Sequence, residues 1–239
     1  MSTRQKFMEH LEALRDALVG MAIGWALGAL VVVFNFNEIL SLLKAPLHGV
    51  PGAELITLSP LTGIFIGFNI VTVGGVIVGA PLMILYALKF LAPALKAKEQ
   101  KVLGIVALLA AALFMVGVAF GFCWMLPLSL QIAMTLQDAM GFKLLWNAQE
   151  YFSFVVALPL IMGGAFCIPL IMGVLVRLRV LDHAALSKRW DVASLVILIL
   201  AAAITPTGDP VTFIFIAIPL AVLYVLALVF GKPPAKALR

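Results

Sequence analysis

The stretch VLGIVALLAAALFMVGVAFGFCWML, residues 102–126, contains 25 consecutive residues without a charged side chain. An α-helix needs about 20 such residues to cross a hydrocarbon layer of about 30 Å. Other uncharged stretches occur along the chain, in which 64% of the 239 residues are hydrophobic and 11% are charged. A soluble domain carries roughly a quarter charged residues. The sequence therefore predicts an all-α polytopic membrane protein.

The uncharged stretches predict six transmembrane helices within a single membrane domain over residues 1–239. Their expected ranges are 17–36, 64–88, 102–126, 151–176, 192–203 and 211–230. The last two are expected to be short. Only 13 residues separate Asp191 from Thr205, so the fifth helix is either a short span in a thinned bilayer or half of a re-entrant pair.

Lysine and arginine lie mostly on one side of these spans. The predicted loops 37–63, 127–150 and 204–210 contain 2 of these side chains, and the remaining segments contain 14. Loops rich in lysine and arginine stay in the cytoplasm. Both termini are therefore expected to be cytoplasmic. The net charge of +5 is explained by the lysines and arginines of the cytoplasmic segments. No basic tract with interleaved aromatic residues indicates a nucleic-acid partner.

The segments that flank the spans also carry patterns. Phe7, Leu11, Leu14 and Leu18 recur at intervals of four, three and four residues, which predicts an amphipathic helix leading along the cytoplasmic interface into the first span. Prolines in residues 37–63 predict an irregular or briefly helical loop. Residues 127–150 are expected to form an amphipathic cap with an interfacial tryptophan.

Motifs for catalysis are missing from the sequence. It contains no G-x-S-x-G, no H-E-x-x-H and no glycine-rich phosphate loop followed by lysine. Cys123 and Cys167 have no metal-type or redox-type spacing. We therefore predict a protein that is not an enzyme and has no metal or cofactor. A small-solute transporter is an alternative, although transporters usually carry more ionisable groups within their spans or show repeated halves.

Five short motifs flank the predicted spans. They are HLEALR at residues 10–15, APL at 45–47, LITLSP at 55–60, FLAPAL at 90–95 with Glu99, and TPTGD at 205–209. Each has an ordinary explanation by itself, such as an interfacial anchor, a proline at a helix end or a tight turn. A carboxylate close to the hydrocarbon layer is costly, so Asp209 favours a functional or structural partner.

In this order, the motifs resemble those of the TatC family, the C subunit of the Sec-independent, or twin-arginine, protein translocase. The resemblance implies a receptor in the bacterial plasma (inner) membrane that binds twin-arginine signal peptides on the cytoplasmic side. Export of folded proteins is then driven by the proton-motive force. The resemblance also implies single-span partner subunits of the TatA and TatB type and a homo-oligomer within a larger complex.

The resemblance assigns the signal-peptide site to the cytoplasmic rim, where two glutamates of the family bind two guanidinium groups. Glu99 occupies one of these positions, Phe90 flanks it with apolar surface, and Arg15 ends the first motif. Charge-assisted hydrogen bonds of this kind contribute about 1.5–3 kcal/mol when shielded from water. Structural or partner-binding roles are implied for Pro46, Pro93, Pro206 and Asp209.

The second family glutamate is replaced here by Ala13. Glu12 precedes it by one residue and is rotated by about 100° on a helix. Glu9 and Asp16 lie four residues before and three residues after Ala13, on its own face, and are candidates to supply the charge.

The polar residues that the family carries in the fourth and sixth helices are replaced by Cys167 and Phe213. A diverged paralogue that keeps the fold as a membrane scaffold with altered partners is therefore a second interpretation.

Overall fold

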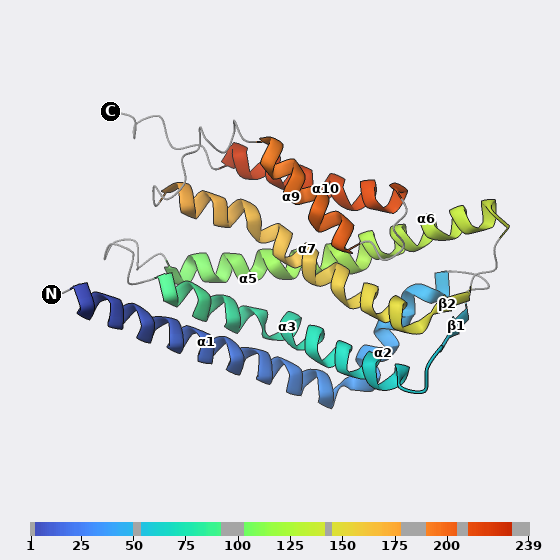
Figure 1. The fold of residues 1–239 in the computed structure, drawn as a ribbon, viewed down its shortest axis with the longest axis horizontal. Helices are drawn as coiled ribbons and strands as arrows, with labels where there is room; N and C mark the ends of the chain where they lie inside the picture. The colour runs from blue at the N-terminus through green and yellow to red at the C-terminus, as the bar shows by residue number, and fades with distance from the viewer. Residues whose placement is uncertain are drawn as a thin grey trace.

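The structure, a computed structural model, describes residues 3–49, 54–91, 103–141, 145–177, 190–204 and 210–230. The elements of these residues are mostly α-helices that run along one common direction (Figure 1). In chain order they are α1 (Thr3–Phe34), α2 (Phe36–Lys44), the 3-10 helix η1 (Ala45–Gly49), β1 (Glu54–Ile56), α3 (Thr62–Leu91), α5 (Leu103–Phe120), the π-helix η3 (Gly121–Met125), α6 (Leu126–Ala139), β2 (Leu145–Asn147), α7 (Ala148–Arg177), α9 (Trp190–Ile204) and α10 (Pro210–Phe230).

Each predicted span coincides with a helix of the structure, which confirms the helical membrane fold. Four helices among the described residues are long and apolar enough to cross a membrane, and they are Leu11–Phe34, Thr62–Phe90, Leu103–Ala139 and Ala148–Val174. Helix α9 has 15 residues, a length of about 22 Å, and is short as expected. Helix α10 has 21 residues and reaches about 31 Å.

The N-terminal amphipathic segment is part of the first long helix. Helix α1 runs without a break from Thr3 to Phe34 over 32 residues, because no proline interrupts this stretch. The predicted segment therefore continues in the direction of the span.

The third predicted span is longer than expected. The helix does not end at residue 126 but continues through η3 and α6 to Ala139, so the expectation of a loop from residue 127 was wrong. Pro127 lies in the first turn of α6, where its missing N–H and fixed φ are tolerated. The wider π turn that precedes it accommodates the proline ring without ending the helix.

The predicted outer segments contain short regular elements. Helix α2 and η1 occupy much of the first loop, which agrees with a briefly helical connection. Strands β1 and β2 pair in parallel, with Glu54 opposite Leu145 and Ile56 opposite Asn147, and neither strand was expected. Figure 1 shows that the strands and α2 lie at one end of the helices, named here the strand end.

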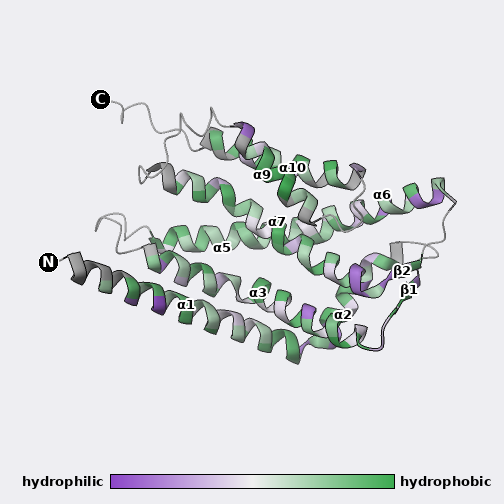
Figure 2. Ribbon diagram, in the orientation of Figure 1, coloured by the Kyte–Doolittle hydropathy of each residue, from purple (hydrophilic) through white to green (hydrophobic). Residues whose placement is uncertain are grey.

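Helix α7 occupies the centre of the fold. Half of its most apolar 18-residue window is buried, compared with 22–28% for the other three long helices. Val155, Leu158 and Met162 are fully buried in its middle. Hydrophobic colour covers most of the long helices in Figure 2, and many large apolar side chains face outward. Such surfaces require lipid, because a soluble protein rarely exposes large contiguous apolar patches.

The end opposite the strands is named here the basic end. The start of α1, the end of α3, the start of α5 and the ends of α7 and α10 all lie toward this end of the fold (Figure 1). The helix ends that lead into the predicted cytoplasmic segments, which are rich in lysine and arginine, are therefore at the same end of the fold.

Candidate functional site

Helices α1 and α3 pack closely because glycines line their contact. Gly20, Gly24 and Gly28 recur every four residues on α1 and are buried. A Cβ on Gly24 would lie 3.1 Å from Met83 Cγ, and a Cβ on Gly28 would lie 2.6 Å from the backbone nitrogen of Gly79. Small residues allow helix backbones to approach closely within a membrane. This contact holds the start of α1, which carries the first sequence motif, beside the end of α3.

A groove of about 420 Å³ lies between α1 and α3 at the basic end. Its lining residues are Arg15, Asp16, Val19, Gly20, Ile23 and Tyr86. The ring of Tyr86 lies directly against Gly20, where any Cβ would collide with it. The Lys89 ammonium lies 5.1 Å from the centre of that ring, within cation–π range. This α1–α3 groove therefore combines apolar walls, an aromatic ring and charged side chains.

Arg15 and Asp16 form an ion pair beside the groove. The Nη2 and Nε atoms of Arg15 donate hydrogen bonds to Asp16 Oδ1 at 2.8 Å and 3.1 Å. The two side chains are 73% and 68% exposed, so water screens their attraction and the pair adds little to stability. A second guanidinium can therefore replace Arg15 at the Asp16 carboxylate at little cost.

Ala13 lies on the stripe of α1 that turns toward α3. It is half-buried, and the stripe continues through the buried residues Ala17 and Gly20. Glu12 is exposed and does not line the α1–α3 groove. Among the described acidic side chains near position 13, Asp16 is the one that the structure places in the groove.

Several predicted site residues are not covered by the structure. Glu99, Pro93, Pro206 and Asp209 lie outside the described residues. Glu9 belongs to the backbone of α1, but its side chain is also outside the described part of the structure. Phe90 is half-buried in the last turn of α3, at the same end as the groove, whereas Pro46 lies in η1 at the strand end.

Tyr86 and Lys89 were missed by the sequence analysis. Tyr86 precedes Phe90 by four residues near the end of a span, so both side chains project from one helical face. This pair of aromatic residues in the sequence indicates the groove. The residue of α1 that packs against Tyr86 is Gly20, and a glycine has no side chain by which the sequence could indicate a binding site.

Cys167 and Phe213, at the two positions where the resemblance implies polar side chains, lie in hydrophobic clusters of the interior. The buried Cys167 thiol donates a hydrogen bond to the Ala110 carbonyl, with an S–O distance of 3.4 Å. Cys167 packs in a small cluster with Ala80 and Phe114. Phe213 packs against the main hydrophobic core. The described interior around these residues is therefore closed by hydrophobic packing.

The fold and the groove define a class of protein: a multi-pass helical membrane protein with a charged, partly aromatic groove where two of its helices meet. The chain matches the family model described as Sec-independent protein translocase protein (TatC) over residues 9–219. It therefore belongs to the TatC family, whose members are components of the twin-arginine translocase and work with other Tat subunits. This is not a family of catalytic enzymes.

Individual relatives agree with this assignment. The chain is 30% identical to the Sec-independent protein translocase protein TatC of Deinococcus radiodurans, over 94% of this chain and 84% of that protein. It is 31% identical to the TatC protein of Aquifex aeolicus, over 94% and 93% of the two chains. A crystal structure described as the twin-arginine translocase receptor TatC in DDM superimposes with a TM-score of 0.86 at 30% identity, covering 94% of this chain and 100% of that one.

Proposed function

We propose that this chain is the receptor subunit that binds twin-arginine signal peptides on the cytoplasmic side of a translocase that exports folded proteins, driven by the proton-motive force. The observation that carries the proposal is the α1–α3 groove, which is lined by Asp16 and Tyr86. The Asp16 carboxylate is held only by an exposed ion pair with Arg15, which another arginine can replace. A signal peptide presents guanidinium groups followed by apolar residues, and the groove offers partners for both.

The proposed binding mode combines the groove with the resemblance. One arginine of the signal peptide replaces Arg15 at Asp16, and the second binds Glu99, the carboxylate that the resemblance assigns to this site. The apolar stretch that follows the arginines packs along Val19, Ile23 and Tyr86. Phe90 adds apolar surface at the same end.

The orientation is also part of the proposal. The basic end faces the cytoplasm, so both termini are cytoplasmic, and the chain crosses the membrane six times. With the native cysteines replaced, single cysteines introduced at Ala97 and Ser187 should react with an impermeant thiol reagent from the cytoplasmic side only. Cysteines at Gly49 and Asn147 should react from the other side only. Labelling of position 187 from outside would contradict the placement of the fourth and fifth spans.

The site itself is tested by signal-peptide binding to purified variants. Glu99→Gln keeps the side-chain size and removes the charge, and it should weaken binding at least tenfold, or by about 1.4 kcal/mol. Asp16→Asn combined with Glu9→Gln should weaken binding more than either change alone, and Ala13→Glu should restore it. The matched control is Glu12→Gln, with an expected change under about 0.5 kcal/mol.

Two results would contradict the site. If Glu12 is essential while Glu9 and Asp16 are dispensable, the first motif is displaced by one residue. If none of the three matters and Glu99 does, the site binds a single arginine. The chain is then a diverged paralogue with altered partners.

The remaining partner roles stay proposals of the same kind. Single-span subunits of the TatA and TatB type and further copies of this chain are the expected protein partners. We propose that four residues shape the segments that contact these protein partners: Pro46, Pro93, Pro206 and Asp209. Since Cys167 and Phe213 lie in apolar packing, we expect contacts near them to be apolar.

A further inference from the structure

A second cavity lies at the strand end, on the opposite end of the fold from the α1–α3 groove. Its volume is about 210 Å³, about seven times the share of one water in liquid water. It is lined by Ser129, Leu130, Ala133 and Gln137 of α6, by Leu145, Trp146 and Asn147 of β2, and by Glu150, Tyr151 and Phe154 of α7. This set of residues is called the strand-end cavity below.

The polar side chains of the cavity are held in place by hydrogen bonds. The Asn147 side-chain oxygen accepts a hydrogen bond from the Gln149 N–H at 3.0 Å and so caps the start of α7. The Asn147 side-chain nitrogen donates to Glu150 Oε1 at 3.3 Å. The Glu150 carboxylate is thus positioned by a neutral donor.

The aromatic wall is also fixed. The rings of Trp146 and Tyr151 stack with their centres 6.2 Å apart. The Tyr151 hydroxyl donates to the Leu43 carbonyl at 2.8 Å, and the Trp146 ring nitrogen donates to Gln137 Oε1 at 3.4 Å. A carboxylate beside two aromatic rings favours a cation, through charge and through the negative ring faces.

The cavity changes from polar to apolar along both of its helices. On α7, Phe154 lies one turn deeper than Glu150, and on α6, Ala133 and Leu130 lie deeper than Gln137. The candidate membrane span of α7 begins at Ala148, and tryptophan and tyrosine are enriched at the level of lipid head groups. The cavity therefore offers a charged rim to the interface and an apolar floor toward the hydrocarbon layer.

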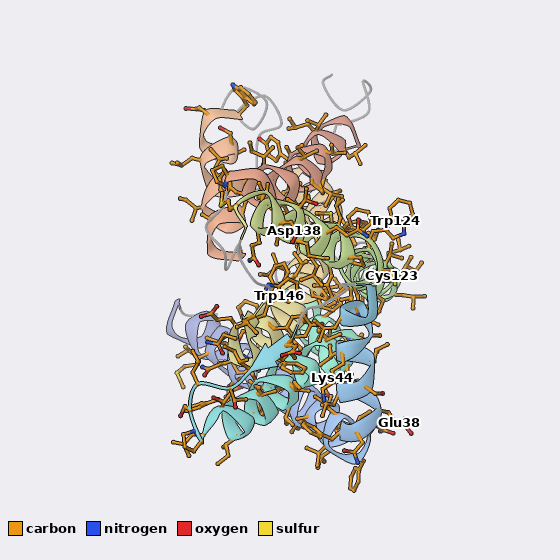
Figure 3. All side chains as sticks on the ribbon, turned by 90° about the vertical axis from the view of Figure 1, so that its right-hand side faces the viewer. Glu38, Lys44, Cys123, Trp124, Asp138 and Trp146 are labelled. Atoms are coloured by element: carbon orange, nitrogen blue, oxygen red, sulfur yellow. The ribbon has the colours of Figure 1, made fainter. Side chains whose placement is uncertain are left out.

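The charge of this end is negative. Among the described residues of the segments 37–63 and 127–150, four side chains are acidic and one is basic: Glu38, Glu54, Asp138 and Glu150, and Lys44. Figure 3 looks onto this end and shows Asp138 of α6 near Trp146. A cationic group is attracted to such a surface, and an anionic group is repelled.

From this cavity we infer a lipid site that binds the ammonium head group of a phosphatidylethanolamine molecule from the leaflet at the strand end. The ammonium pairs with Glu150 and lies against Trp146. The apolar part of the lipid begins over Leu130, Ala133 and Phe154. A phosphatidylglycerol molecule has no cation for Glu150, so the site selects against it.

The test is lipid retention by the full-length protein. The protein is reconstituted in vesicles of equimolar phosphatidylethanolamine and phosphatidylglycerol, extracted in mild detergent, and its bound lipids are counted by native mass spectrometry. We expect a preference of about fivefold for phosphatidylethanolamine, the ratio given by about 1 kcal/mol at the upper end for an exposed charge pair. Glu150→Gln should reduce the preference to about twofold or less.

The matched control is Glu38→Gln, which removes the same charge from an exposed residue on α2, away from Trp146 (Figure 3). It should leave the preference unchanged. Ala133→Leu fills the cavity without changing charge and should lower phosphatidylethanolamine retention. Equal retention of the two lipids by the unmodified protein would overturn the inference. So would an equal loss of preference in Glu38→Gln and Glu150→Gln, because the selectivity would then arise from surface charge alone.

Discussion

The contact of α1 with α3 gives the most quantitative prediction of stability. At Gly28, an added Cβ would overlap the Gly75 carbonyl oxygen and lie 2.6 Å from the Gly79 nitrogen and 3.0 Å from its Cα. Ordinary contacts of a Cβ begin at 3.4 Å, so the two backbones must separate to relieve the overlap. Overpacking of this kind costs about 1–3 kcal/mol.

Gly164 is the matched control for Gly28, because an added Cβ there meets nothing within 4 Å. Alanine gains about 0.8–1 kcal/mol over glycine inside a helix, and this gain is common to both positions. The free energy of unfolding in mixed detergent micelles should therefore be about 1–3 kcal/mol lower for Gly28→Ala than for Gly164→Ala. Equal stability of the two variants would refute the close contact.

Two further predictions concern side chains of the interior. Tyr151→Phe removes the donor to the buried Leu43 carbonyl and should lower the free energy of unfolding in detergent by about 1–3 kcal/mol; no loss would show that this hydrogen bond is unimportant. Cys123 is exposed and Cys167 is buried, so a membrane-permeant maleimide should modify Cys123 in the folded protein and Cys167 only after unfolding. Mass spectrometry of the modified protein checks this order, and early labelling of Cys167 would contradict its packing.

The spans were predictable from the sequence because they depend on local composition. An uncharged stretch long enough to cross the bilayer is sufficient to predict a helix, and each predicted span except the fifth contains one. The boundary at residue 126 failed because a proline after a π turn does not end a helix, and the sequence pattern carries no sign of that turn. The parallel pairing of β1 with β2 joins residues about 90 positions apart. Strands of three residues are too short to show alternation.

The site could be predicted only in part. Motif spacing placed Arg15 and Asp16 at the start of the first span, and the structure brings them to the groove. Tyr86 was not predicted, because its role depends on the close approach that Gly20 allows. Glu99 lies outside the described residues, and its role stays a prediction from the resemblance. The strand-end cavity depends on the meeting of α6, β2 and α7, which no single stretch of sequence reveals.

Recognition of paired arginines is measured by the dissociation constant of a signal peptide. A twin-arginine peptide and its twin-lysine counterpart are titrated onto the unmodified full-length chain in lipid nanodiscs. Lysine keeps the charge but cannot form the planar two-pronged contact of a guanidinium with a carboxylate. We predict that the twin-arginine peptide binds at least about tenfold more tightly, a difference of about 1.4 kcal/mol. Equal dissociation constants for the two peptides would contradict the recognition of paired arginines.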